Sequence, residues 1–193
     1  MTNHQLQIIL GSQSPRRREL LAGLDIPFTA VSIEADESYP SHLKAGDIPY
    51  YISRAKAQAY APNLKENQLL ITADTIVWLD GRMMGKPHDE AEAVEMLKCL
   101  RNHTHQVYTA VTFARKGEDL ETLVDCTDVT FGELTDEQIN YYVQKYRPFD
   151  KAGAYGVQEW IGYVACTSMR GSYFNVMGLP VHLVYKALTR QME

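Results

Sequence analysis

The sequence predicts an α/β protein in which a mixed, twisted β-sheet is flanked by helices. Apolar, β-branched runs typical of strands recur between segments with helical spacing, and the two kinds follow each other without strict strand–helix–strand order. The 193 residues are 45% hydrophobic and 22% charged, which is enough to bury a sizeable core. Because no repeat, low-complexity stretch or glycine/serine linker divides the chain, we expect a single domain over residues 1–193.

The first half of the chain begins with a strand followed by a helix. The apolar run 6–10 is typical of a buried strand. Ser14-Pro15 then predicts a helix start, because serine is a preferred N-cap and proline a preferred first helical residue. The further elements expected here are a short helix with an apolar face at 20–24, a strand over 28–33, a helix from Asp47 to Tyr60 that Asp47 could cap, apolar strands over 68–73 and 75–79, and a hairpin turn at Asp80-Gly81.

The second half repeats this mixture of helices and strands. Apolar residues at helical spacing predict a helix from about His88 to Leu100. The remaining elements expected are paired strands over 106–114 and 123–131, a polar turn between them at 116–118, a helix opening at Thr135, a glycine-rich strand region after that helix, and a last helix that starts at Leu179-Pro180.

Charge and cysteine content exclude several classes of protein. The net charge of −5 argues against binding of nucleic acid through a general basic field, so the partner expected is a small anion. The three widely spaced cysteines form no CxxC pair, which argues for reduced thiols over disulfides or structural zinc. Met1–Gln5 lack a basic signal-peptide start, and no apolar run approaches 18 residues. We therefore expect a soluble, cytoplasmic protein that makes no membrane contact.

The turn after the first strand has the features of a phosphate site. The helix N-terminus there carries partial positive charge, and Asp or Glu is normally favoured at such a position. Here Arg16, Arg17 and Arg18 stand in the first turn instead, beside the hydroxyls of Ser12 and Ser14. This repulsion is explained if a polyanion binds at the same place. A solvated basic surface turn is the alternative reading of the motif.

Asp74 is the sharpest candidate for chemistry, because it interrupts an apolar strand-like run. Burying a carboxylate costs several kcal/mol unless it is paired or bound to metal. Asp74 could be a metal ligand, a general base for water, or both, or it could simply end one strand and cap a turn. The acidic loop with Glu34, Asp36 and Glu37 could supply further oxygen ligands for Mg²⁺, or it could be a solvated loop.

Two later segments could also meet a phosphorylated ligand. Gly85-Lys86-Pro87 places a lysine on a short rigid turn, although most turn lysines only face water. Residues 150–158 combine small residues, which permit close backbone approach, with Lys151, a tyrosine and the amide of Gln158. A glycine-rich strand bend is the alternative there. The pair His103 and His105 could chelate a transition metal, but no third His or Cys stands at a familiar ligand spacing.

Taken in order, these motifs resemble the Maf family of nucleotide pyrophosphatases. The motifs that carry the resemblance are Ser12-x-Ser14-Pro-Arg-Arg, Ala73-Asp74-Thr75, Gly85-Lys86-Pro87, Asp150-Lys-Ala-Gly-Ala-Tyr-Gly-Val-Gln158 and Met177-Gly178-Leu179-Pro180. The resemblance implies a two-lobed α/β fold with a central cleft, like that of inosine triphosphate pyrophosphatases. It also implies hydrolysis of a nucleoside triphosphate to the monophosphate and pyrophosphate with a divalent metal, Mg²⁺ or Mn²⁺, by a protein that forms a homodimer.

The resemblance also implies a role for individual residues. Asp74 matches the family's proton acceptor, and Arg16, Thr75 and Gln158 match positions that set substrate choice. The pattern at Thr75 and Gln158 resembles the dTTP/UTP branch rather than the branch that acts on 7-methyl-GTP. The other polar residues expected in the cleft are Glu37, for which Glu34 and Asp36 compete, together with Lys56 and Lys86.

The residue chemistry agrees with this assignment. Phosphoryl transfer needs positioning and charge neutralisation more than covalent help. We therefore expect a metal held by Asp74 and Glu37 to bridge the phosphates while water attacks the α-phosphorus. The side chains expected to bind substrate are Ser12, Ser14, Arg16, Arg17, Lys56, Thr75, Lys86, Lys151 and Gln158. The competing interpretations are a non-catalytic nucleotide sensor in cell division and a phosphomonoesterase, which would release orthophosphate.

Overall fold

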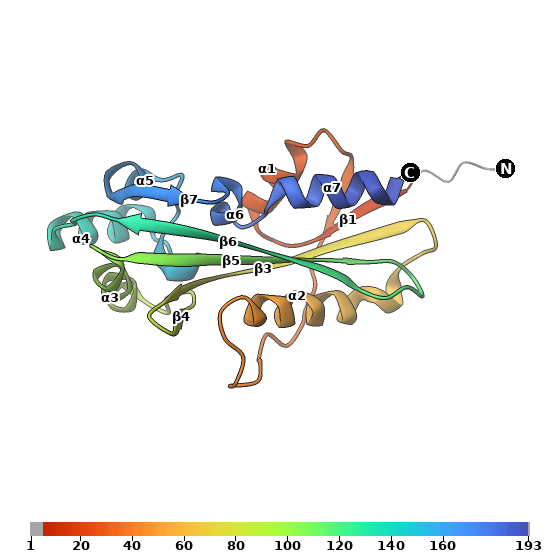
Figure 1. Ribbon diagram of the computed structural model, residues 1–193, viewed down its shortest axis with the longest axis horizontal. Helices are drawn as coiled ribbons and strands as arrows, with labels where there is room; N and C mark the ends of the chain where they lie inside the picture. The colour runs from red at the N-terminus through yellow and green to blue at the C-terminus, as the bar shows by residue number, and fades with distance from the viewer. Residues whose placement is uncertain (1–5, 193) are drawn as a thin grey trace. The chain divides into compact units, whose positions relative to one another are not determined.

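The computed structural model of the protein describes residues 6–192 (Figure 1). The predictions for Met1–Gln5 therefore fall outside the described residues. The strands are β1 (Gln7–Gly11), β2 (Phe28–Val31), β3 (Gln68–Leu79), β4 (Arg82–Met84), β5 (Thr104–Ala114), β6 (Glu121–Phe131) and β7 (Cys166–Arg170). The helices are α1 (Pro15–Ala22), α2 (Asp47–Tyr60), α3 (Glu90–Leu100), α4 (Asp136–Tyr146), α5 (Trp160–Ala165), α6 (Tyr173–Met177) and α7 (Val181–Met192), with 3₁₀ turns η1 (Ala61–Asn63) and η2 (Ala152–Ala154).

The seven strands within residues 6–192 form one mixed sheet, as predicted. Its order is β2-β1-β3-β5-β6-β7, and β4 pairs with β3 off this path. Strand β1 runs parallel to both β2 and β3, whereas the pairs β3–β4 and β6–β7 are antiparallel. The predicted hairpin at Asp80-Gly81 is confirmed, because it joins β3 to β4 with both residues at positive φ, 48° and 81°. The mixed α/β class inferred from the sequence is therefore confirmed.

The chain divides into two compact units. Of the described residues, the first unit comprises 6–74, 109–125 and 178–192, and the second comprises Thr75–Tyr108 and Cys126–Met177. Strands β3, β5 and β6 contribute residues to both. The expectation of a single domain over residues 1–193 and that of a central cleft stay predictions.

The first unit is built around the strands that the N-terminal apolar runs form. Ile9 of β1 and Leu70 of β3 pack with Ala57 of α2, and each of these side chains is almost fully buried. Figure 1 shows α2 on one face of this part of the sheet and α1 and α7 on the other. Helix α2 thus lies against the strand that carries Asp74. This position determines which side chains of α2 can reach the Asp74 carboxylate.

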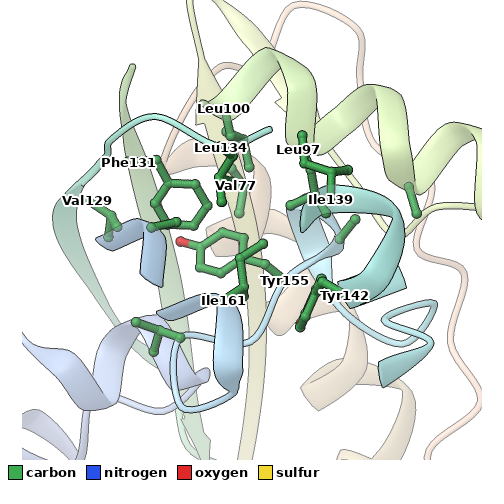
Figure 2. Close-up of a cluster of buried hydrophobic side chains, with 14 of the residues drawn as sticks. Val77, Leu97, Leu100, Val129, Phe131, Leu134, Ile139, Tyr142, Tyr155 and Ile161 are labelled. Atoms are coloured by element: carbon green, nitrogen blue, oxygen red, sulfur yellow. The ribbon is translucent and has the colours of Figure 1, made fainter. Parts of the chain in front are cut away.

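The second unit has its own core of apolar and aromatic side chains. Figure 2 shows Tyr155 inside this cluster, among side chains such as Val77 and Phe131. The rings of Phe131 and Tyr155 meet edge to face, with centroids 4.8 Å apart. Because Tyr155 is buried, its hydroxyl needs a partner, and it shares a hydrogen bond of 2.7 Å with Nε2 of buried His105.

His105 predicts a loss of stability in mild acid. Burial lowers the pKa of this imidazole from 6.5 to about 4. Below pH 6.5 the unfolded chain takes up the proton first, so stability falls as pH drops from 6.5 towards 4, by on the order of 3 kcal/mol. Urea titrations at pH 7.5, 5.5 and 4.5 measure this slope. In His105→Gln, whose amide can still bond Tyr155, the slope over that window should flatten, and an unchanged slope would assign it to other groups.

Two local predictions about secondary structure are wrong. Asp47 is the first residue of α2 and not its cap, since the N-cap position is Gly46 without a side-chain hydrogen bond. The alternative of a glycine-rich strand bend at residues 150–158 is also wrong, because these residues form a loop with the turn η2. The reason is local backbone conformation, because Gly153 and Ala154 have φ of 68° and 59°, which a strand cannot accommodate.

Candidate active site

The turn between β1 and α1 carries the serines and arginines predicted to cradle phosphate. The Oγ of buried Ser12 accepts a hydrogen bond from the Ser14 amide at 3.2 Å. The Ser14 side chain accepts one from the Arg17 amide at 3.5 Å and so caps α1, with Pro15 in its first turn. The predicted helix start is confirmed. The two hydroxyls are ordered by the turn itself, and Arg16 and Arg17 stand at the positive end of the helix.

Arg17 and Arg18 are held by backbone carbonyls. The Nε of Arg17 donates to the Gly178 carbonyl at 2.8 Å, across a sequence separation of 161 residues. The Nε of Arg18 donates back to the Ser12 carbonyl at 3.4 Å, so Arg18 braces the turn. The sequence placed Arg18 in the basic turn but not among the expected substrate-binding side chains, and it predicted no contact for Gly178. Only the Met177-Gly178-Leu179-Pro180 motif in the family pattern pointed to that segment.

Asp74 lies in the middle of β3, which continues without interruption from Gln68 to Leu79. The alternative in which Asp74 ends a strand is therefore wrong. Its Oδ1 accepts a hydrogen bond from Nζ of Lys56 at 2.8 Å, and both side chains are only 13% exposed. The same ammonium lies 2.9 Å from Oε1 of Glu37. Three of the predicted site residues thus meet at one point.

Buried hydroxyls fix the distance between α2 and β3. Thr72 lies two residues before Asp74 and therefore on the same face of the strand. Its Oγ1 donates to the Ser53 carbonyl at 2.7 Å, and Ser53 Oγ bonds Thr112 Oγ1 at 2.8 Å. Ser53 precedes Lys56 by three residues, so the two occupy one face of the helix. This arrangement presents Lys56 to Asp74.

Burial and the neighbouring charges have opposite effects on the pKa values of Asp74 and Arg17. Burial raises the pKa of Asp74 above its usual value, although the positive charges of Lys56 and Arg17 oppose this shift. Burial likewise lowers the pKa of Arg17, against the attraction of Asp74. A carboxylate with a raised pKa is a better proton acceptor than an ordinary aspartate. The arrangement suits a group that takes a proton during the reaction.

The acidic loop contributes one carboxylate to this site. Asp36 turns back on its own loop, where its oxygens accept 2.8 Å hydrogen bonds from the amide and hydroxyl of Ser38. These bonds lower the pKa of Asp36. Glu34 is exposed, whereas Glu37 reaches Lys56. Of the three competing carboxylates, the structure therefore brings Glu37 to Asp74.

The donor set fits a hard divalent cation. Mg²⁺ in phosphate-transfer sites is held by one or two carboxylates, and substrate phosphates and water complete its coordination. Asp74 and Glu37 supply two carboxylates that converge on a single positive charge, that of Lys56. Among residues 6–192, no group of three or more His, Cys, Asp or Glu side chains is arranged to hold a metal without such help. Any ion bound here would depend on the substrate for much of its coordination.

The second unit brings Lys86 and the loop 150–158 together. The Gly85 carbonyl accepts a hydrogen bond from the Gly153 amide at 3.0 Å, which ties the two segments. Lys86 is exposed beside this bond. Gly153 has a left-handed φ of 68°, and a Cβ added there would lie 2.9 Å from Val77 Cγ2, which explains why glycine stands there. Thr75 lies on β3, directly after Asp74.

Lys151 and Gln158 occupy the ends of that loop. Lys151 is 8% exposed, and its Nζ lies 2.8 Å from Asp150 Oδ1 and 3.2 Å from Glu159 Oε1. Within the described chain, no hydrogen-bond partner reaches the buried Oε1 of Gln158. A buried acceptor without a partner is costly. The Gln158 amide is therefore the group in this loop most in need of a ligand.

The histidine pair does not form a metal site. His105 is buried against Tyr155, whereas His103 is exposed and its Nδ1 bonds the Arg101 carbonyl. The two imidazoles therefore lie in different environments and have different hydrogen-bond partners. The alternative in which they chelate a transition metal has no support.

Known proteins are similar to this chain over nearly its whole length. The family described as Maf-like protein matches residues 7–191 of this chain. The chain belongs to the Maf family. A dTTP/UTP pyrophosphatase of Parabacteroides distasonis is 51% identical over 183 residues, covering 94% of this Maf chain and 94% of its own. The dTTP/UTP pyrophosphatase of Phocaeicola vulgatus is 51% identical with 95% of each chain covered, and that of Porphyromonas gingivalis is 50% identical, covering 94% of this chain and 92% of its own.

Solved structures agree on the fold of this Maf protein. The Ham1 protein of Staphylococcus aureus matches with a TM-score of 0.57 and 14% identity, covering 96% of this chain and 99% of that one. The HAM1 protein of Coxiella burnetii matches with a TM-score of 0.50 and 15% identity over 96% of this chain and all of its own. The expected likeness to a known mixed α/β fold is confirmed. Among the described residues, no helix is both long and apolar enough to cross a membrane.

Proposed function

We propose that this Maf protein hydrolyses dTTP and UTP to the nucleoside monophosphate and pyrophosphate. The observation that carries the proposal is the buried carboxylate of Asp74, which lies mid-strand and is joined to Glu37 through Lys56. Burying Asp74 costs folding energy, and catalysis explains why it is kept. The names of relatives at about half identity over nearly the whole chain support dTTP and UTP as substrates.

In this proposal Asp74 accepts the proton of the water that attacks the α-phosphorus. The phosphoanhydride bond to the leaving pyrophosphate breaks, and the nucleoside monophosphate keeps the new oxygen. Asp74 and Glu37 would hold a divalent cation, Mg²⁺ or Mn²⁺, which supplies charge neutralisation on the phosphates. Burial raises the pKa of Asp74 towards that of a useful general base, so the same environment that destabilises the carboxylate aids the chemistry.

The remaining predicted residues are assigned by their chemistry. Guanidinium and ammonium groups bind phosphate oxygens, so Arg16, Arg17, Lys56 and Lys86 are proposed to hold the triphosphate, beside Ser12 and Ser14. Thr75 and Gln158 are proposed to select the base. Direct substrate binding by Lys151 stays a prediction, since its ammonium already contacts two carboxylates.

Gln158 suits the pyrimidine end of the substrate. Its amide offers one acceptor and two donors, which match the N3–H and O4 groups of uracil or thymine. The buried, unpartnered Oε1 within the described chain supports this role, because a base N–H would satisfy it.

Gln158→Glu should lower selectivity for uracil over cytosine. The glutamate can still accept from N3–H, but it loses the donor for O4 and repels that oxygen. We expect the ratio of kcat/KM for UTP to that for CTP to fall about tenfold, the value of one good hydrogen bond. Steady-state pyrophosphate release measures both constants. Gln144→Glu, the same change on the exposed surface of α4, should leave the ratio unaltered, and equal ratios in both variants would remove Gln158 from base selection.

A nucleotide sensor remains the second candidate function. It would bind nucleotide through the same cradle and release no product. Purified protein with Mg²⁺ and UTP, dTTP, CTP, ATP, GTP or 7-methyl-GTP separates the cases by product. UMP or TMP with pyrophosphate supports the proposal, binding without turnover supports the sensor, and orthophosphate supports a phosphomonoesterase.

The cellular setting forms part of the same proposal. None of the three cysteines, Cys99, Cys126 and Cys166, forms a disulfide, as expected in a reducing compartment such as the cytoplasm. The family resemblance implies a homodimer, and light scattering on the purified protein tests this directly.

A further inference from the structure

The hydroxyl of Tyr142 joins α4 to the loop that carries Gln158. Tyr142 is fully buried, and its Oη accepts a hydrogen bond from the Gly156 amide at 3.0 Å. The same hydroxyl donates to Oε2 of Glu159. One side chain therefore holds the loop on both sides of Gln158, two residues before it and one residue after it.

Glu159 is engaged through both carboxylate oxygens. Its Oε2 receives the Tyr142 hydroxyl, while Oε1 lies 3.2 Å from Nζ of Lys151. Lys151 also contacts Asp150 at 2.8 Å. The network thus carries two negative charges against one positive charge. A cluster with net negative charge would repel a triphosphate, so it is better suited to lie beside the uncharged base of a nucleotide.

Packing around Gly156 leaves the loop little freedom. A Cβ added at Gly156 would lie 3.0 Å from Glu159 Cδ, 3.1 Å from Gln158 Nε2 and 3.1 Å from Lys151 Cε. The Gln158 amide therefore lies over the Gly156 backbone, beside the network. The Glu159 amide closes the turn by donating to the Gly156 carbonyl at 3.0 Å.

We propose that Tyr142 and Glu159 are positioning residues that fix Gln158 for base selection, so that the network sets the preference for uracil and thymine over cytosine. This inference rests on the proposed function. A glutamine amide that can flip presents either donor or acceptor to a ring nitrogen and cannot by itself exclude cytosine. Discrimination between uracil and cytosine therefore requires that the backbone of Gln158 and one face of its amide be held in place. Burial also raises the pKa of Tyr142 well above its usual range, so the hydroxyl keeps the proton that it donates to Glu159.

Tyr142→Phe tests the inference, because it removes the hydroxyl and keeps the buried ring. We expect the ratio of kcat/KM for UTP to that for CTP to fall about tenfold. Most of the change should appear in KM for UTP, with kcat within about threefold of wild type, since the phosphate chemistry is untouched. Tyr155→Phe is the matched control: it removes the hydroxyl of another tyrosine in the same buried cluster, which bonds His105. It should lower thermal stability comparably and leave the ratio unchanged.

Glu159 variants provide a second arm that does not depend on the folding of Tyr142→Phe. Glu159→Ala removes the acceptor of the Tyr142 hydroxyl and should lower the ratio about tenfold. Glu159→Gln keeps an acceptor and should retain the ratio within about threefold. Equal UTP-to-CTP ratios in wild type, Tyr142→Phe and Glu159→Ala would overturn the inference.

Nucleotide binding separates this inference from the proposed function. Calorimetry with UMP and CMP measures base preference without turnover. If the wild-type protein released no pyrophosphate from UTP, the proposed function would fail. A preference for UMP that is lost in Tyr142→Phe and kept in Tyr155→Phe would still support the positioning role, and a preference unchanged in both would overturn it.

Discussion

Asp74→Asn is expected to lower UTP turnover by roughly 10³-fold or more while the fold is kept. Asparagine has nearly the same shape, but it can neither accept the proton of the attacking water nor offer an anionic oxygen to a cation. Pyrophosphate release at saturating UTP and Mg²⁺ measures the loss. Asp80→Asn, at the exposed hairpin turn that ends β3, is the matched control and should keep normal turnover. Near-normal turnover in Asp74→Asn would remove Asp74 from the catalytic role.

The same variant should be at least as stable as wild type at neutral pH. Burial raises the pKa of Asp74, so the unfolded chain loses this proton at lower pH than the folded chain does. Stability of the wild type therefore falls as pH rises from the ordinary aspartate value through the folded pKa. Asparagine lacks this titration. Thermal melts of both proteins should show an advantage for Asp74→Asn at pH 7 that shrinks near pH 4, and a lower melting temperature of the variant at pH 7 would contradict the sign.

Gly162→Ala is expected to destabilise the second unit by about 3 kcal/mol or more. A Cβ at this position would lie 1.7 Å from the Val157 carbonyl oxygen and 2.6 Å from its carbon. These are backbone atoms next to Gln158, and they cannot rotate away as the end of a side chain could. Either α5 or the loop must move. Urea denaturation and thermal melts measure the loss, with a fall in melting temperature of about 10 °C.

Gly85→Ala is the control for this substitution in the same unit. A Cβ there meets only Met83 Cε at 3.6 Å, which is ordinary contact. Its free energy of unfolding should stay within about 0.5 kcal/mol of wild type. Because displacement at Gly162 would shift Val157 and its neighbour Gln158, Gly162→Ala should also weaken the preference for UTP over CTP. Wild-type stability in this variant would contradict the crowding argument.

Local signals in the sequence predicted most elements of the fold. The start of α1 followed from Ser14-Pro15, and the β3–β4 hairpin followed from Asp80-Gly81, because caps and turns depend on a few neighbouring residues. At residues 150–158 the small residues left two alternatives open, close approach by a ligand and a strand bend, and the structure shows a loop. The loop conformation there depends on positive φ at Gly153 and Ala154, which no side-chain pattern announces.

The sequence predicted which residues form the candidate site better than it predicted the contacts among them. Asp74 stood out because a carboxylate inside an apolar strand demands an explanation, and Gln158 stood out through the family pattern. The choice of Glu37 over Asp36 could not be made from sequence, since it depends on which loop carboxylate reaches Lys56. No sequence pattern predicted the hydrogen bonds of the Tyr142 hydroxyl.

The sequence by itself determined the alternation of strands and helices, the start of α1, the family and the main candidate residues. These depend on neighbouring residues or on motifs in fixed order. Only the tertiary structure decided that Asp74 meets Lys56 and Glu37, that Arg17 bonds the Gly178 carbonyl and that Tyr142 bonds Glu159. Such contacts join segments far apart in the chain, and they form because buried charges and hydroxyls must find partners once the apolar faces have packed.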